Sequence, residues 1–234
     1  MWKLNRLLVL IASLTTATTV HASSQEAQLL EVLNSDATLR EKSDACRQLA
    51  RIATKESVPT LSALLKDDKL AHMARYALEP IPDPSVDQAL RDALGQVSGR
   101  VKLGVIGSLG ARRDAQAVDA LAELLRQEAV AQAAARALGN IGVLEAAEAL
   151  EAALPGKSGA VQLAVCEGLL RCAEALAARD QTEPSQAIYD RLRLSSALPT
   201  QVRAAALRGA ILAREEQGAA LLVEAMQDDD YALA

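Results

Sequence analysis

The sequence predicts an all-α protein, an α-solenoid of about six stacked helix-turn-helix units that wind into a superhelix. Three observations predict this class. Ala and Leu, two of the best helix formers, make up more than a third of the 234 residues. Aromatic residues, which favour strands, are only 2% of the chain, and Phe is absent. Helical stripes of apolar residues also recur along the chain at an interval of about 30 residues.

The first helix of each unit is marked by an anchor Leu that follows a run of small residues. Successive anchors are 29, 31, 29, 31 and 38 residues apart. In the first five units another apolar residue lies four positions earlier. In four of them an Ile or Cys lies three positions later, which places all three on one helix face. The anchors are Leu49, Leu78, Leu109, Leu138, Leu169 and Leu207.

The second helix of each unit is a shorter amphipathic stretch of about ten residues, found in the first four units. Its central residues are Leu61, Leu90, Leu121 and Leu150, separated by 29, 31 and 29 residues. Ser57 and Ser85 stand where N-caps belong, and Pro59 is tolerated in a first helical turn. Neither helix can bury its apolar face alone, so the units are expected to stack.

The pattern changes towards the C-terminus. In the fifth unit the first helix is expected to run on through residues 172–180, and another helix to begin near Thr182. We interpret this as a longer local unit, and the alternative is an inserted ligand-contacting feature. Residues 226–234 repeat the pattern of 65–73, where a new first helix begins, and no polar capping unit follows. We therefore expect the array to be incomplete there, and the alternative is an open flank that docks a partner.

The N-terminus has the three regions of a cleavable signal peptide. Lys3 and Arg6 precede an apolar run at 7–14, and a small-residue site ends at Ala22. The run is shorter than the ~20 residues that a membrane span needs. We expect residues 1–22 to be removed, and a single array at 23–234 to be exported to the periplasm or the medium. The alternative is a buried helix of the fold. Losing Lys3 and Arg6 would change the net charge from −5 to −7.

Two adjacent segments carry a family resemblance. AAARALGNIG at 133–142 and LEAAEALEAAL at 144–154 resemble the two helices of HEAT-like repeats. The resemblance covers residues 39–234, and the period is similar to that of the short bacterial, lyase-type variety. The chain also resembles exported bacterial HEAT-repeat domain-containing proteins. Tetratricopeptide repeats have a period of ~34 and a Trp-Leu-Gly-Tyr signature that is missing here.

The resemblance implies that the second helices line a concave face that binds a protein or peptide. That face would be mainly acidic, so a basic partner would complement it, although an ordinary charged helix surface is an equally good interpretation. The residues expected to face a partner there are Arg91, Asp92, Asp119, Glu123, Glu148 and Glu151.

The sequence offers little that could act on a substrate. Cys46, Cys166 and Cys172 lie too far apart, or on different faces of one helix, to form disulfides, and are expected to be core thiols. His72 is the only His after residue 22, so no metal, haem or catalytic-triad arrangement is predicted. The spacing of the glycines in GVIGSLG at 104–110 favours close helix packing over a phosphate loop. No Lys/Arg cluster or aromatic platform suggests nucleic acid.

The leading hypothesis is therefore a non-enzymatic exported scaffold that needs no cofactor and mediates protein interactions. One alternative is the solenoid arm of a larger secreted hydrolase or redox protein, with its catalytic domain beyond Ala234. A second is a relative of the HEAT-like bilin lyases, against which the shortage of His and aromatic residues argues.

Overall fold

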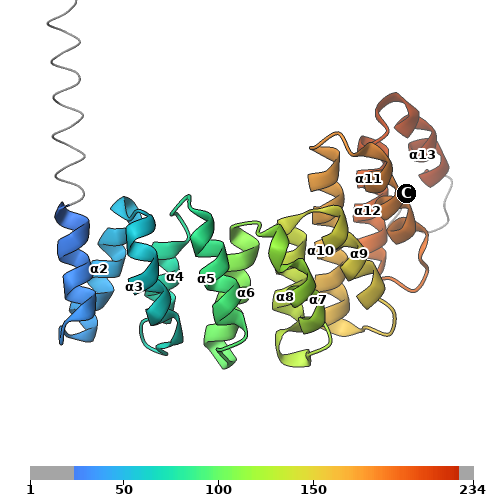
Figure 1. The fold of residues 1–234 in the computed structure, drawn as a ribbon. Helices are drawn as coiled ribbons and strands as arrows, with labels where there is room; N and C mark the ends of the chain where they lie inside the picture. The colour runs from blue at the N-terminus through green and yellow to red at the C-terminus, as the bar shows by residue number, and fades with distance from the viewer. Residues whose placement is uncertain (1–23, 227–234) are drawn as a thin grey trace, which may run out of the picture. The chain divides into compact units, whose positions relative to one another are not determined.

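The computed structural model describes residues 24–226, and within that range it contains helices and connections but no strand. The predicted signal peptide at 1–22 and most of the expected incomplete repeat at 226–234 lie outside the described residues. The described chain is an α-solenoid, as predicted (Figure 1). It divides into two compact units, one ending at Val105 and the other beginning at Ile106, inside helix α6.

The first unit contains the helical segment 24–34 and four complete helices, followed by the start of α6. The helices are α2 (Leu39–Ile52), α3 (Val58–Ala63), α4 (Ala71–Leu78), α5 (Pro84–Leu94) and α6 (Gly99–Ala111). Short 3-10 turns, η1 (Lys55–Ser57) and η2 (Leu64–Lys66), flank α3.

The second unit contains the end of α6 and seven further helices within the described range. They are α7 (Val118–Leu124), α8 (Glu128–Ile141), α9 (Leu144–Ala153), α10 (Gly159–Ala177), α11 (Thr182–Leu194), α12 (Thr200–Leu212) and α13 (Gly218–Ala225). The 3-10 turns η3 (Ala115–Ala117) and η4 (Glu215–Gln217) precede α7 and α13. The expected extension of the fifth unit is confirmed by the 19-residue α10 and by α11, which begins at Thr182.

The predicted core is confirmed for the first five units. Their anchor leucines are at most 1% exposed, and the four central leucines of the second helices are completely buried. The three cysteines are free and buried, as expected. Each helix therefore buries one apolar stripe against its neighbours, which is the arrangement that the repeat predicts.

The sixth anchor was predicted one residue too late. Leu207 is only half-buried, whereas Val202, Ala206 and Ala210 are buried. The cause lies at Gly209, where a Cβ would come 2.2 Å from a ring carbon of Tyr189. The Tyr189 ring packs against this glycine, and α12 buries its small residues instead of Leu207.

The N-cap prediction is correct in position for Ser57, which precedes α3, and wrong for Ser85. Asp83, and not Ser85, caps α5, and its Oδ1 accepts from the Ser85 backbone N–H at 2.9 Å. Ser57 makes no capping bond, because its buried hydroxyl donates to Glu26 Oε1 at 2.5 Å. The same carboxylate accepts from the backbone N–H of Thr54 at 2.8 Å, which fastens the segment 24–34 to η1. A carboxylate that is 5% exposed needs such donors.

Small residues bring the first helices of the second unit close together. A Cβ on Gly139 of α8 would lie 2.6 Å from Gly168 Cα in α10, and one on Gly110 would lie 2.7 Å from Ala137 Cα. The predicted close packing is thus confirmed for Gly110. At Gly104 the Arg75 guanidinium packs against the glycine and donates to its carbonyl at 3.1 Å. The prediction of close packing is wrong for Gly107, where a Cβ would meet no atom within 4 Å.

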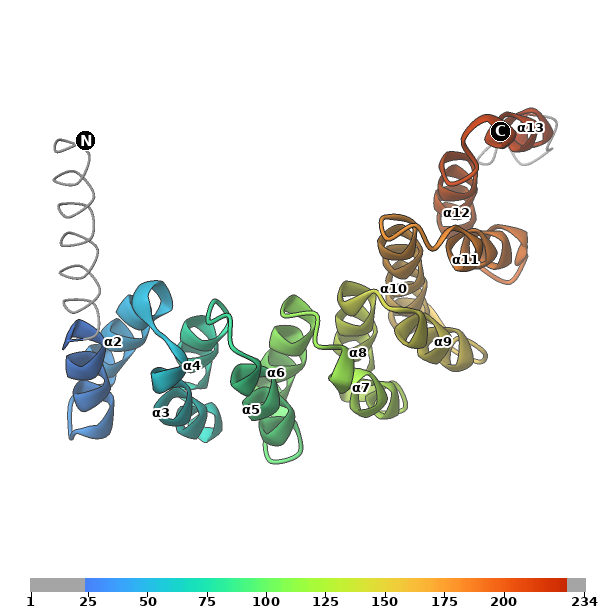
Figure 2. The same ribbon diagram turned by 45° about the horizontal axis from the view of Figure 1, so that its top comes forward.

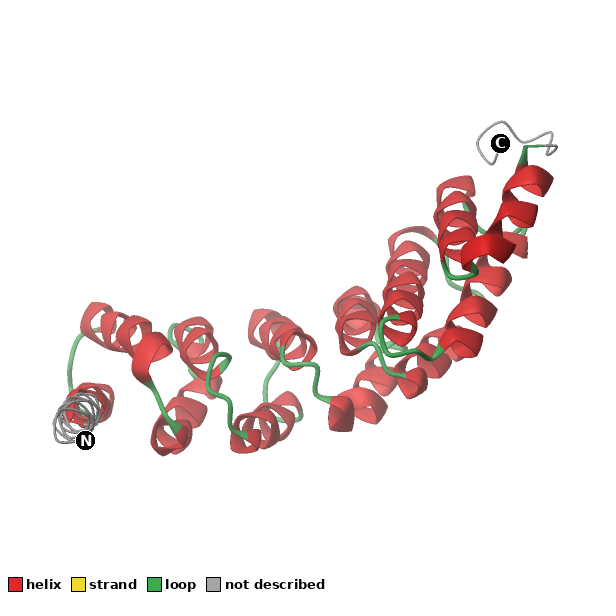
Figure 3. Cartoon of the chain, turned by 90° about the horizontal axis from the view of Figure 1, so that it is seen from above, coloured by secondary structure: helices red, strands yellow, loops and turns green. Residues whose placement is uncertain are grey.

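This close approach decides which helices face inward in the second unit. Figure 2 shows α8, α10 and α12 on the inner side of the curve of this unit and α7, α9 and α11 on its outer side. Figure 3 shows the same two rows from above. The second helices α7 and α9 contain no glycine, so they cannot approach each other as closely. The prediction that second helices line the concave face is therefore wrong for this unit.

Candidate functional site

The six charged residues predicted to face a partner do not form one acidic surface. Arg91 and Asp92 lie on α5 in the first unit, and the other four lie on α7 and α9 in the second. Asp92 and three of the four carboxylates in the second unit are exposed, whereas Arg91 and Glu151 are half-buried. The carboxylates of α7 and α9 lie on outer-row helices (Figure 2).

Several of these carboxylates already have partners. Glu123 accepts from Arg126 Nη1 at 2.7 Å, and Glu151 accepts from Arg191 Nε at 2.9 Å. Asp92 accepts from the Gln88 side chain at 2.7 Å. Arg126 and Arg191 offset part of the negative charge that the sequence suggested, so this face is a weaker candidate for binding a basic partner.

A different site emerges on the inner row of the second unit. A pocket of about 670 Å³ lies at the C-terminal ends of α6, α8 and α10. Its floor is made of small residues, namely Gly110, Ala111, Gly139, Ala175 and Ala178. Its polar lining residues are Arg113, Asn140, Arg171, Glu174 and Arg179. We call it the arginine pocket.

The three arginines are held in different ways. Arg171 Nη1 donates to Asn140 Oδ1 at 2.5 Å, which links α10 to α8 at equivalent positions, two residues beyond their anchors. Arg179 Nη1 donates to the Gly142 carbonyl at 2.7 Å and so satisfies one of the free carbonyls at the end of α8. The exposed Arg113 guanidinium has no hydrogen-bond or ion-pair partner among residues 24–226.

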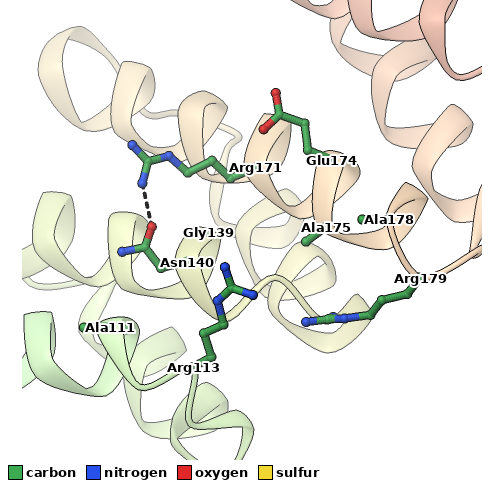
Figure 4. A pocket seen from close by; sticks show the side chains of 10 residues that line it. Ala111, Arg113, Gly139, Asn140, Arg171, Glu174, Ala175, Ala178 and Arg179 are labelled. Carbon is green, nitrogen blue, oxygen red and sulfur yellow. Dashed lines mark hydrogen bonds between the residues drawn. The ribbon is translucent and has the colours of Figure 1, made fainter. Parts of the chain in front are cut away.

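Figure 4 shows how the side chains are directed. The guanidinium groups of Arg113 and Arg179 point toward each other below Gly139 and Ala175 in this view, and Arg171 reaches Asn140 at one side. Glu174 points away from the guanidinium groups of Arg113 and Arg179. Three positive charges therefore surround an open space to which the lining contributes one carboxylate.

The position of Arg113 follows from the way α6 ends. Its backbone is left-handed, with a φ of 54°, and Gly142 and Asp180 adopt the same conformation after α8 and α10. The Arg113 N–H bonds to the Gly110 carbonyl and the Asp114 N–H to the Leu109 carbonyl, both at 3.1 Å. This is the hydrogen-bond pattern of a Schellman motif, whose left-handed residue is usually glycine.

The residues around the pocket do not supply a nucleophile. Cys172 lies directly behind it on α10, and burial raises the pKa of this thiol to about 12 despite the backbone of Gly142 and the charge of Arg179. A thiol with so high a pKa stays protonated and unreactive near neutral pH. Among residues 24–226 no group of three or more His, Cys, Asp or Glu side chains could hold a metal ion.

A second pocket of about 480 Å³ adjoins the first on the inner row. It lies between α10 and α12, and Glu174 lines both pockets. Its lining includes Tyr189, Arg208 and Leu212, and the Leu212 side chain is 67% exposed. The inner face of the second unit thus combines a basic pocket with an exposed apolar contact.

Sequence reasoning missed the arginine pocket. No role in binding was predicted from the sequence for Arg113, Arg171 or Arg179. The available signal was positional, since Arg113 and Arg179 follow the ends of first helices and Arg171 comes two residues after an anchor leucine. Their convergence depends on how α6 stacks on α8 and α8 on α10.

Comparison with known proteins agrees with this architecture. A family model described as HEAT repeats matches residues 88–170. This part of the chain is similar to HEAT repeats. The HEAT-like resemblance noted in the sequence is thereby confirmed, and such repeats generally mediate protein interactions.

A solved structure extends the fold similarity beyond the matched HEAT repeats. The crystal structure of an engineered protein aligns with a TM-score of 0.50 and 22% identity, over 83% of this chain and 97% of that one. At that identity the similarity concerns the fold alone. No curated protein matches the chain. None of the helices in residues 24–226 is long and apolar enough to cross a membrane.

Proposed function

We propose that the protein is an exported scaffold that binds another protein through the inner face of its second unit and catalyses no reaction. The observation that carries this proposal is the pair of adjoining pockets on that face, with the unpartnered Arg113 in one and the exposed Leu212 in the other. HEAT repeats are a fold suited to protein binding, and the signal-like residues 1–22 support export.

The inner face is the better candidate because it has unsatisfied binding capacity. Interfaces are typically built from aromatic, apolar and Arg side chains around a desolvated centre. Leu212 and the arginines supply the apolar and Arg types on the inner row. On the outer row two of the predicted carboxylates, Glu123 and Glu151, are instead paired with arginines.

Site-specific photo-crosslinking in the producing cell would test the proposal. A photoreactive residue would replace Leu212 on the inner face, and in a matched variant Glu148 on the outer face, since both side chains are exposed. We expect a discrete crosslinked product from position 212 and none from position 148. Equal products from both positions, or none from 212, would contradict the proposal.

A further inference from the structure

We propose that the arginine pocket binds an acidic segment of the partner protein, a stretch of chain with two or more carboxylate side chains. This inference rests on the proposed function and names the chemistry of the partner. It reverses the sign expected from the sequence, which suggested an acidic face and a basic partner.

The charge of the lining favours carboxylates. Arg113, Arg171 and Arg179 contribute three guanidinium groups, while Glu174 is directed away from two of them (Figure 4). A guanidinium carries five N–H donors in a planar fork that matches a carboxylate with two bonds. Arg171 and Arg179 each commit Nη1 to a protein oxygen, and their other N–H groups can reach a ligand.

The size and floor of the pocket favour a polypeptide over a small inorganic anion. A volume of about 670 Å³ is in the range of sites that hold ligands of many atoms. The glycines and alanines of the floor project little or no side chain into this space. A main chain can therefore lie close against α8 and α10 while its carboxylates reach the arginines.

The backbone of Arg113 supports the assignment independently of its charge. Glycine is favoured in the left-handed conformation that ends α6, and Gly142 occupies the same place after α8. An arginine there is held in an unfavourable conformation without a bond from its guanidinium to the described protein. Strained residues of this kind are concentrated at binding sites.

The left-handed backbone also supplies a clean test variant. In Arg113→Gly the guanidinium disappears while the backbone takes its preferred residue, so loss of folding does not obscure the result. Asp180→Gly is the matched control, because Asp180 is exposed and has the same backbone conformation as Arg113. This substitution removes a negative charge instead of a positive one. Arg171→Gln and Arg179→Gln test the other two arginines.

Binding would be measured with the purified full chain by fluorescence anisotropy of a labelled heptaglutamate peptide, with heptaglutamine as the neutral comparison. We expect heptaglutamate alone to bind, and more weakly as salt is raised. Arg113→Gly is expected to weaken binding roughly ten- to hundredfold, as the loss of one charge-assisted bond implies. Asp180→Gly is expected to bind at least as well as the wild type.

Two results would overturn the inference. One is equal heptaglutamate affinity in the wild type, Arg113→Gly and the two glutamine variants, which would place the peptide elsewhere. The other is complete displacement of the peptide by inorganic phosphate at a matched concentration of charge, which would indicate a site for small anions.

The crosslinking experiment separates this inference from the proposed function. If the product at position 212 forms equally well in an Arg113→Gly background, the result supports the proposed scaffold function and contradicts the acidic-segment inference. If no product forms at 212 while heptaglutamate binding still depends on Arg113, the result supports acidic-peptide binding at the arginine pocket and contradicts the scaffold proposal.

Discussion

At the residue scale, the helix ends of the second unit include positions where the residue that favours binding is not the residue that favours stability. Arg113 and Asp180 both adopt left-handed backbones, with φ of 54° and 61°. This conformation is costly for residues other than Gly, and least so for Asn and Asp. Binding and folding therefore make opposite demands on position 113.

The first prediction concerns this backbone. Arg113→Gly should raise the free energy of unfolding by about 1 kcal/mol, since it relieves the left-handed strain. Asp180→Gly should raise it by less, because Asp tolerates the conformation better. Urea denaturation followed by circular dichroism would measure both changes. A loss of stability in Arg113→Gly would mean that the arginine side chain supports the fold.

The second prediction concerns the buried thiols. Burial raises the pKa of Cys46 and Cys166 to about 11 and that of Cys172 to about 12. Above about pH 9 the unfolded thiols lose protons that the folded thiols keep. The unfolded state then binds fewer protons, so the free energy of unfolding falls as pH rises from about 9 towards 12.

Comparison with Cys172→Ala isolates one thiol. The stability advantage of the wild type over this variant should shrink by about 1 to 2 kcal/mol between pH 8 and pH 10, because only the wild type carries the thiol whose pKa is raised. Urea titrations of both proteins at the two pH values would measure it. An advantage that does not change with pH would show that the thiol ionises equally in the folded and unfolded states.

At the element scale, glycines set how closely the first helices pack. A methyl group on Gly139 would lie 2.6 Å from Gly168 Cα, where only backbone is available to move. The same group on Gly107 of α6 would meet nothing within 4 Å. Gly139 therefore leaves no room for a side chain and Gly107 does, although both lie in first helices.

The third prediction uses this contrast. Gly139→Ala should lower the free energy of unfolding by about 1 to 3 kcal/mol through overpacking of α8 against α10. Gly107→Ala should raise it by about 0.5 to 1 kcal/mol, since Ala is the better residue inside a helix. Thermal and urea unfolding of the two variants would measure the difference. Similar effects from both substitutions would remove glycine packing as the cause of the close helix approach.

The existence and order of the helices from α2 onward could be predicted, because these helices carry apolar stripes that recur along the chain, whereas the helical segment 24–34 was not predicted. The sixth unit shows where that reasoning stops. Leu207 fits the repeat, yet Ala206 is buried in its place because the Tyr189 ring packs on Gly209. Contact between two helices, which the sequence of one helix does not contain, shifted the register by a residue.

At the scale of the whole molecule, net charge was a poor guide to the sign of the site. The chain has a net charge of −5, yet the arginine pocket has three positive residues and one negative one in its lining. Net charge describes the average surface and bears on solubility, whereas a site depends on the few groups that converge there.

The fourth prediction concerns export. The native protein should begin at Ser23 and lack the mass of residues 1–22, because these residues have the charge, apolar run and small-residue site of a signal peptide. Ala22→Arg should leave the precursor uncut, since the position before the cut requires a small residue. His21→Arg is the matched control and should be processed normally. Intact mass spectrometry of cell fractions would measure all three, and an unprocessed wild-type protein would exclude the signal peptide.

The amino-acid sequence alone predicts the helical class, the repeat and the buried leucines and cysteines, because these follow from periodic patterns that each helix contains. It could not determine which row of helices faces inward, since that depends on the contacts of Gly110 with Ala137 and of Gly139 with Gly168 across helices. It also could not determine the arginine pocket. Arg113, Arg171 and Arg179 are up to 66 residues apart in the chain, and only the stacking of three first helices brings them to one space.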